Sequence, residues 1–182
     1  IGLAQIRKYD SFLLKERERV ARSYHAFFSK YEHFELPPLE DENRKSCFHL
    51  YALRINGCKE FQRDLIIEGI TQMGVAVNVH FIPMPMLTLF KNLGYKIEDY
   101  PVAYDNYSRE ISLPIYPQLT NDQVEYICEA VLTSFKKVLG HVLLKAKGGY
   151  VKLFNKKNNN KQATLLYNVL LQISQNTVDG KT

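Results

Sequence analysis

Residues 59–82, KEFQRDLIIEGITQMGVAVNVHFI, combine a helix pattern, a glycine and a strand pattern in one stretch. Apolar residues recur at helical spacing over the first part, which predicts a helix with one buried face. Gly74 suits the left-handed conformation that closes such a helix. Residues 75–82 then alternate, with valines on one face and Asn78 and His80 on the other, as in a strand. The stretch therefore predicts a helix that returns into a sheet.

The rest of the first 140 residues predicts four helices and two strands around this unit. They are a helix over 3–31, a strand over 47–55, a short helix within 87–100, a helix over 101–110, a strand over 111–116 and a helix from 120 to Gly140. The strand over 47–55 is apolar on both faces, so we expect it to be central. Pro114 places the strand over 111–116 at a sheet edge. This order predicts an α/β domain, with a small sheet covered by helices.

Composition and charge separate a body from a tail. The chain has 182 residues, 46% of them hydrophobic, with 24 Lys and Arg against 19 Asp and Glu. Residues 1–137 hold 17 basic and 18 acidic residues, for a net charge of −1, whereas residues 138–182 hold 7 lysines and one aspartate, for +6. The tail over 138–182 is rich in lysine and asparagine, and 163–173 predict one more helix. Its lysine-only run over 145–161 is more typical of a solvated linker than of a nucleic-acid-binding surface.

Several classes of protein are disfavoured by the sequence. No apolar run approaches the roughly 20 residues that span a bilayer, and the N-terminus has no signal-peptide pattern. Three cysteines without metal-binding spacing favour reduced thiols in a reducing compartment. We therefore expect a cytoplasmic protein that binds no metal and no membrane. The first residue is not methionine, which predicts that the chain is a fragment.

Asn78 and His80 are the most informative polar pair. They lie side by side on one face of the predicted strand, just before a loop that Pro83 begins. An amide and an imidazole presented at a strand end are typical of a binding site. The alternative is that both are buried polar groups satisfied within the fold. Phosphate-binding glycine loops, nucleophile elbows and zinc-protease motifs do not occur in the sequence.

Three segments together resemble a known family. They are IGLAQ over 1–5, RDLIIEGITQMGVAVNVHF over 63–81 and NLGYKIEDYPVAYDNYSREISLPIYPQLT over 92–120. The second ends in a V-H-aromatic motif, and the third contains S-L-P-x-Y-P-x-L-T. In this order they resemble the C-terminal domain of the DegT/DnrJ/StrS family of pyridoxal-phosphate-dependent sugar aminotransferases. The resemblance covers 1–137, with 1–31 as a long connecting helix.

The resemblance implies the small, mostly antiparallel sheet of about three strands found in the C-terminal domain of the aspartate-aminotransferase fold, fold type I. It implies a homodimer that moves an amino group from glutamate to a nucleotide-linked keto sugar for polysaccharide or glycan biosynthesis. The cofactor is pyridoxal 5′-phosphate, and the family's Schiff-base lysine lies in the preceding domain. No residue here is therefore assigned as catalytic, and this part alone is expected to be inactive.

The same resemblance assigns His80 to the sugar-nucleotide pocket, with Asn78 and Phe81 beside it. Many members carry a second histidine where Pro85 and Met86 stand here, so the identity of the sugar does not follow. An alternative from a different class is a stand-alone small-molecule-binding or regulatory module without catalysis. Binding of a nucleotide sugar by the isolated chain would favour that module.

Overall fold

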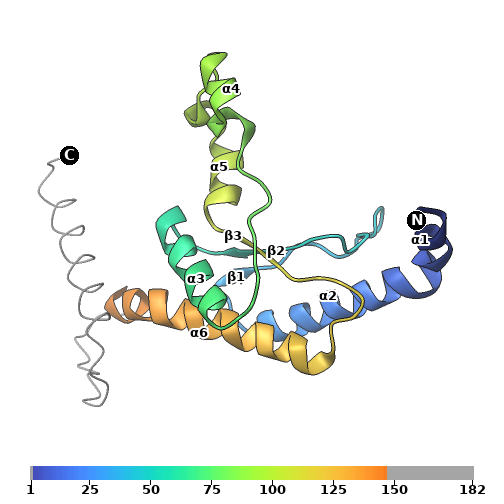
Figure 1. Ribbon diagram of the computed structural model, residues 1–182. Helices are drawn as coiled ribbons and strands as arrows, with labels where there is room; N and C mark the ends of the chain where they lie inside the picture. The colour runs from blue at the N-terminus through green and yellow to red at the C-terminus, as the bar shows by residue number, and fades with distance from the viewer. Residues whose placement is uncertain (1, 147–182) are drawn as a thin grey trace, which may run out of the picture. The chain divides into compact units, whose positions relative to one another are not determined.

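The computed structural model describes residues 2–146, with side chains described as far as residue 140 (Figure 1). The helices are α1 (Gly2–Lys8), the π-helical turn η1 (Tyr9–Leu13), α2 (Leu14–Phe28), α3 (Glu60–Gln72), the 3-10 turn η2 (Met84–Met86), α4 (Thr88–Asn92), the 3-10 turn η3 (Ile97–Asp99), α5 (Pro101–Ser108) and α6 (Asn121–Ala146). The strands are β1 (Phe34–Glu35), β2 (Tyr51–Ile55) and β3 (Glu110–Leu113). The extra helix predicted over 163–173 and most of the basic tail lie outside the described residues.

The sheet has three antiparallel strands in the order β1-β2-β3. Its register pairs Tyr51 with Leu113 and Leu53 with Ile111. The predictions of a central strand over 47–55 and of an edge strand over 111–116 are confirmed, although both strands are shorter than predicted and β3 ends before Pro114. The sequence did not indicate β1, because two residues are too few to show an alternating pattern.

The strand predicted over 75–82 is wrong. This segment meets β3 in a single bridge, between Asn78 and Ser112. Two residues later the backbone N–H of His80 donates to a side chain rather than to a strand carbonyl. Pro83 then removes a backbone donor, so the ladder cannot continue. The alternating pattern predicted side-chain exposure along the segment, but not how many of its backbone groups find a strand partner.

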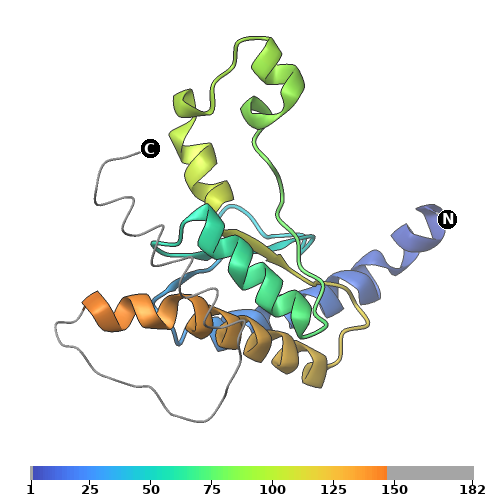
Figure 2. The same ribbon diagram turned by 60° about the vertical axis from the view of Figure 1, so that its left-hand side comes forward.

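One face of the sheet carries the core. Tyr51, Leu53 and Ile55 of β2 are fully buried, and α2, α3 and α6 bring apolar residues to them (Figure 2). The Tyr24 ring of α2 lies 5.0 Å from the Tyr51 ring. The Tyr24 hydroxyl donates to the Pro114 carbonyl at 2.7 Å and so ties α2 to the end of β3.

Helix ends follow the sequence in three places and differ in one. Gly74 has φ of +77° and closes α3 as predicted. Thr120 and Gln123 cap α6 reciprocally, each backbone N–H donating to the other side chain at 3.0 and 3.2 Å. Pro101 begins α5. The predicted stop at Gly140 is wrong, because α6 continues to Ala146; glycine within a helix costs only about 1 kcal/mol.

The helix predicted over 3–31 is helical over Gly2–Phe28, with the π-helical turn η1 inside it. The apolar residues of this helix are buried in one part and exposed in another. Val20 and Tyr24 are fully buried in the core, whereas Leu3 and Ile6 are 63% and 72% exposed. The N-terminal third of this helix is therefore not covered by any described residue.

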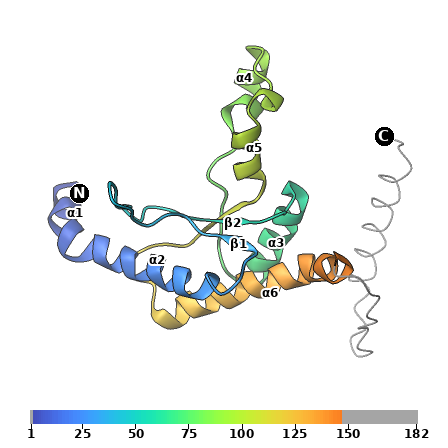
Figure 3. The same ribbon diagram turned by 180° about the vertical axis from the view of Figure 1, so that it is seen from behind.

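Residues 81–107 form an arm that holds α4 and all but the last residue of α5, drawn in green away from the sheet (Figure 3). Large apolar side chains along it are exposed: Phe81, Ile82, Met84, Leu87, Leu89, Leu93, Tyr95, Tyr100, Val102 and Tyr104. Among the described residues, no helix is long and apolar enough to cross a membrane.

We expect the Tyr24 hydroxyl to contribute to stability because it satisfies a carbonyl beside the core. Tyr24→Phe should lower the free energy of unfolding by about 1 kcal/mol. Tyr126→Phe is the matched control, since the Tyr126 hydroxyl donates to the Met73 carbonyl at 2.8 Å but its side chain is exposed. Water replaces that bond, so its loss should be at most half as large. Urea unfolding measures both; equal losses would contradict the prediction.

Candidate functional site

The candidate site begins at the free edge of β3. Asn78 donates its backbone N–H to the Ser112 carbonyl at 3.3 Å, and Ser112 returns a bond to the Asn78 carbonyl at 2.8 Å. The opposite edge of β3 pairs with β2. Asn78 is thus fixed to the sheet by two main-chain bonds, and the residues that follow it start from a defined place.

A buried carboxylate continues this attachment. The backbone N–H of His80 donates to Glu110 Oε2 at 3.0 Å, and the Ser112 hydroxyl donates to Glu110 Oε1. Glu110 and Ser112 are only 5% and 4% exposed. They alternate with Ile111 and Leu113 and so face away from the apolar core. Burial raises the pKa of Glu110, while the bonds from Ser112 and His80 oppose that shift.

Arg63 of α3 binds the backbone at the start of β3. The residue is 1% exposed, and its guanidinium donates to the carbonyls of Tyr107 at 2.7 Å and of Glu110 at 3.2 Å. It also pairs with Asp64 at 2.7 Å and lies 4.9 Å from the centre of the Tyr107 ring. A buried cation with carbonyl and carboxylate partners is stabilised rather than stranded. Arg63 therefore fixes the backbone of Glu110 in place.

The three predicted site residues differ in what their side chains do. Asn78 is exposed, and its amide oxygen accepts the backbone N–H of Val79 at 2.8 Å. His80 is half-buried; its Nδ1 is buried and has no hydrogen-bond partner among the described residues. Phe81 is 74% exposed, with its ring 4.7 Å from the imidazole at nearly a right angle. The peptide bond between His80 and Phe81 is cis.

These contacts distinguish two interpretations of the Asn78 and His80 pair, namely a binding site and polar groups satisfied within the fold. Asn78 fits the alternative of a polar group satisfied locally, since its amide oxygen is already bonded. His80 does not, because a buried ring nitrogen without a partner is costly, by about 1–3 kcal/mol. The imidazole and the exposed Phe81 ring are therefore the groups best placed to meet a ligand.

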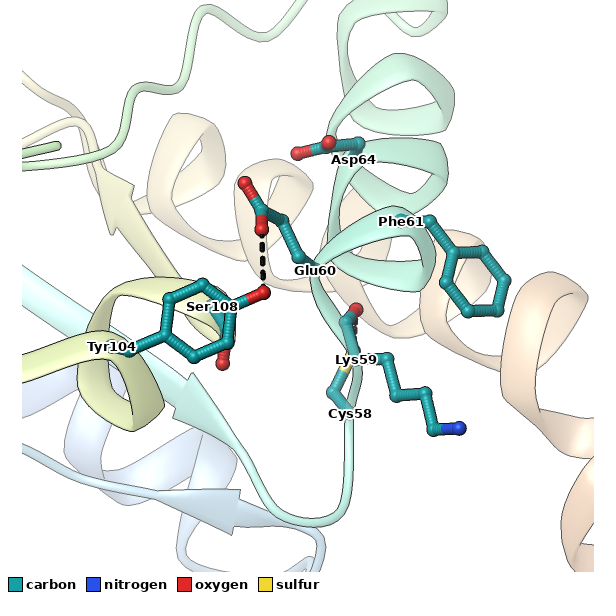
Figure 4. A pocket seen from close by; sticks show the side chains of 7 residues that line it. All are labelled: Cys58, Lys59, Glu60, Phe61, Asp64, Tyr104 and Ser108. Carbon is teal, nitrogen blue, oxygen red and sulfur yellow. Dashed lines mark hydrogen bonds between the residues drawn. The ribbon is translucent and has the colours of Figure 1, made fainter. Parts of the chain in front are cut away.

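A hollow lies apart from this site, between α3 and α5 (Figure 4). The Tyr104 hydroxyl donates to Glu60 at 2.9 Å across it, and this bond raises the pKa of the tyrosine. Cys58 in its wall is buried, which raises its pKa to about 11 and leaves the thiol protonated. Among the described residues, no cluster of His, Cys, Asp or Glu could hold a metal ion. Of the carboxylates in its wall, Glu60 is bonded to Tyr104 and Asp64 pairs with Arg63.

Residues 1–132 match the model of the DegT/DnrJ/EryC1/StrS aminotransferase family. The chain belongs to this aminotransferase family. The spore coat polysaccharide biosynthesis protein SpsC of Bacillus subtilis is 32% identical over 134 residues, which are 72% of this chain and 34% of SpsC. A Helicobacter pylori relative, UDP-4-amino-4,6-dideoxy-N-acetyl-beta-L-altrosamine transaminase, is 31% identical over 137 residues, 75% of this chain and 36% of the relative.

The fold agrees with solved structures of such aminotransferases. The putative sugar aminotransferase Spr1654 from Streptococcus pneumoniae, in its apo-form, superimposes with a TM-score of 0.74 at 36% identity. This match covers 78% of the present chain and 35% of Spr1654; PMP- and PLP-forms of Spr1654 match similarly. The expected small antiparallel sheet of an aminotransferase fold is confirmed. The aminotransferase chain described here spans about a third of the length of the relatives that it matches.

The described residues do not by themselves fit pyridoxal phosphate. A Schiff base needs a lysine in a shielded site, and every lysine whose side chain is described is exposed. They are Lys8, Lys15, Lys30, Lys45, Lys59, Lys91, Lys96, Lys136 and Lys137. None of these lysines is therefore placed to form the Schiff base.

Sequence reasoning found His80 and Phe81 but missed Glu110, Ser112 and Arg63. The strand over 111–116 was predicted to begin one residue too late, so Glu110 fell outside it. The signal that could have found the pair is the alternation of Glu110 and Ser112 with two apolar residues. No local signal marks Arg63 as buried, and only the packing of α3 on β3 buries it.

We expect Glu110 to make stability depend on pH in the opposite sense to a salt-bridged carboxylate. Because the native pKa is raised, the native state binds more protons than the unfolded state between the unfolded value, about 4.3, and the native one. The free energy of unfolding of the wild type therefore falls as pH rises through that window. Glu110→Gln has no titrating group at this position, so this fall is absent from the variant.

Urea unfolding of both proteins from pH about 4 to about 8 tests this. The free energy of unfolding of the variant minus that of wild type should rise with pH through the window and then level off. The subtraction removes residues such as Glu35, whose pKa Arg109 lowers and whose contribution to stability is instead lost as pH falls. A difference that decreases with pH would show that the pKa of Glu110 is lowered.

Proposed function

We propose that this chain forms the C-terminal, substrate-capping domain of a pyridoxal-phosphate-dependent enzyme that transfers an amino group from glutamate to a nucleotide-linked keto sugar. The observation that carries the proposal is the family match over 1–132, joined to a close fold match with Spr1654. When bound, the cofactor acts as the electron sink for amino transfer. In this proposal, residues preceding the described domain bind the cofactor, and two such chains form a homodimer.

His80 is the residue of this chain that we assign to the nucleotide-sugar substrate. The imidazole is half-buried and its Nδ1 has no partner among the described residues; an imidazole can bond a hydroxyl or phosphate oxygen of a ligand. The neighbouring Phe81 ring, 74% exposed, offers an apolar surface on which a sugar or base can lie. Asn78 contributes mainly through its backbone, which holds the segment on β3.

The exposed apolar side chains support a domain that is completed by further protein. Soluble monomers rarely expose apolar patches of more than a few hundred Å², yet Leu89, Leu93 and Val102 of the arm are 64%, 64% and 74% exposed. The relatives contain about twice as much additional chain as the part matched here. We infer that the arm over 81–107 packs on the cofactor-binding part of the enzyme and closes over the substrate.

A hybrid enzyme tests this function. The C-terminal third of the Helicobacter pylori relative is replaced by the full 182-residue chain, and amino transfer from that relative's named UDP-amino sugar to 2-oxoglutarate is measured as glutamate formed. We expect the hybrid to be active and His80→Ala to lower kcat/KM by about a hundredfold. His49→Ala is the matched control, because His49 is exposed and outside the site; it should change little.

The two outcomes separate the hypotheses. A folded hybrid that transfers no amino group would contradict the assignment of a capping domain. Saturable binding of a UDP- or dTDP-sugar by the isolated chain, lost in His80→Ala, would instead favour a stand-alone binding module.

We expect the isolated chain to form no specific adduct with pyridoxal phosphate, because its described lysines are exposed. Borohydride reduction followed by peptide mass spectrometry should find scattered, substoichiometric labelling. One lysine labelled stoichiometrically, together with transaminase activity, would contradict this.

Exposed apolar residues of α1 and of the arm should make the isolated chain self-associate. Sedimentation velocity should show oligomers that increase with concentration, and Leu89→Lys with Leu93→Lys should reduce them. Glu125→Lys, an exposed change on α6, is the charge-matched control and should have little effect. A strict monomer at high concentration would contradict the prediction.

A further inference from the structure

Glu110 lies directly behind the proposed substrate residue. Its Oε2 accepts the backbone N–H of His80 at 3.0 Å, and no hydrogen bond joins it to the imidazole Nδ1, which has no partner among the described residues. The carboxylate thus bonds the main chain of His80 and not its ring. A group in this place orients the residue in front of it without touching a ligand.

The register along β3 explains why a side chain is used here. Asn78 pairs with Ser112 through two main-chain bonds, so an antiparallel ladder would next place His80 opposite Glu110. The Glu110 carbonyl is instead occupied by Arg63 at 3.2 Å. The carboxylate takes over as acceptor for His80, and because it extends beyond the backbone it holds this residue away from the strand while still fixing it.

The carboxylate and the backbone that carries it are held from three directions. The Ser112 hydroxyl donates to the second carboxylate oxygen, Arg54 of β2 lies opposite Glu110 in the register of the sheet, and Arg63 of α3 donates to the Glu110 carbonyl. At 5% exposure it cannot exchange its partners for water without opening the strand. Such a shell of fixed partners is what holds a functional side chain within a narrow range of positions.

We propose that Glu110 is a positioning residue that clamps the backbone of His80 to β3 and thereby sets the orientation of its imidazole toward the substrate. The role in orienting a substrate residue rests on the proposed function; the clamp itself does not. Ser112 supports the clamp by orienting the carboxylate, and Arg63 supports it by occupying the main-chain acceptor that His80 would otherwise use.

Amide hydrogen exchange of the full chain, followed by NMR, tests the clamp. In Glu110→Ala the His80 amide should exchange about tenfold faster or more, while the core amides of Leu53 and Ile111 stay within about twofold. Glu110→Gln keeps an acceptor oxygen and should restore protection to within about threefold of wild type. Glu35→Ala is the matched control, because this half-buried carboxylate of β1 pairs with Arg54 and Arg109 and does not contact His80.

Glu110→Asp gives a second variant in case alanine unfolds the chain. Its carboxylate remains but is one methylene shorter, so the His80 amide should again exchange faster while the core amides do not. An unchanged His80 rate in a folded Glu110→Ala or Glu110→Asp variant would overturn the proposal. So would equal acceleration at His80, Leu53 and Ile111, which would mean that Glu110 only stabilises the fold.

The hybrid enzyme supplies the second readout. Glu110→Ala should lower kcat/KM in the wild-type background. It should have almost no further effect in His80→Ala, because that variant already lacks the ring that Glu110 positions. Additive losses would overturn the positioning role. The exchange rates decide on the clamp whether or not the hybrid is active, so a failure of the proposed function remains distinguishable.

Discussion

The fold and the candidate site both depend on β3 having two different neighbours. One edge is paired along its length with the central strand. Among the described residues, the other edge meets Asn78 through the main chain, His80 through the Glu110 carboxylate and Arg63 through the Glu110 carbonyl. Side chains of β3 alternate accordingly. Ile111 and Leu113 enter the core, and Glu110 and Ser112 serve the segment on the far side. A four-residue strand thus connects the hydrophobic interior to the polar groups that hold His80.

The helices were predictable because their signals are local. Apolar spacing, the capping pair Thr120 and Gln123, and a left-handed Gly74 each act within a few residues, and the structure confirms all three. The central position of 47–55 was predictable because it is apolar on both faces. The predicted helix end at Gly140 was wrong because a glycine closes a helix by adopting a left-handed conformation. Among the described glycines, only Gly57, Gly74 and Gly94 do so.

The site was predictable only in part, for a physical reason. His80 and Phe81 stand out through their types and their place before a proline-rich loop. Arg63 donates to the carbonyls of Tyr107 and Glu110, which lie far away in the sequence, and nothing within a few residues of it indicates burial. Glu110 had a local signal only in its alternation, with Ser112, against two apolar residues. The failed strand over 75–82 has the same origin. The residues do alternate, but pairing with β3 also requires free carbonyl acceptors on β3. The Glu110 carbonyl already accepts a hydrogen bond from Arg63.

The arm over 81–107 has a further consequence for how this domain can change. Its apolar side chains lie largely outside the core, while the sheet and the three packed helices bury their own. Substitutions of these exposed apolar side chains are therefore nearly neutral for folding, and their main effect falls on whatever the arm contacts. The surface of the arm can thus change at little cost to the stability of the scaffold.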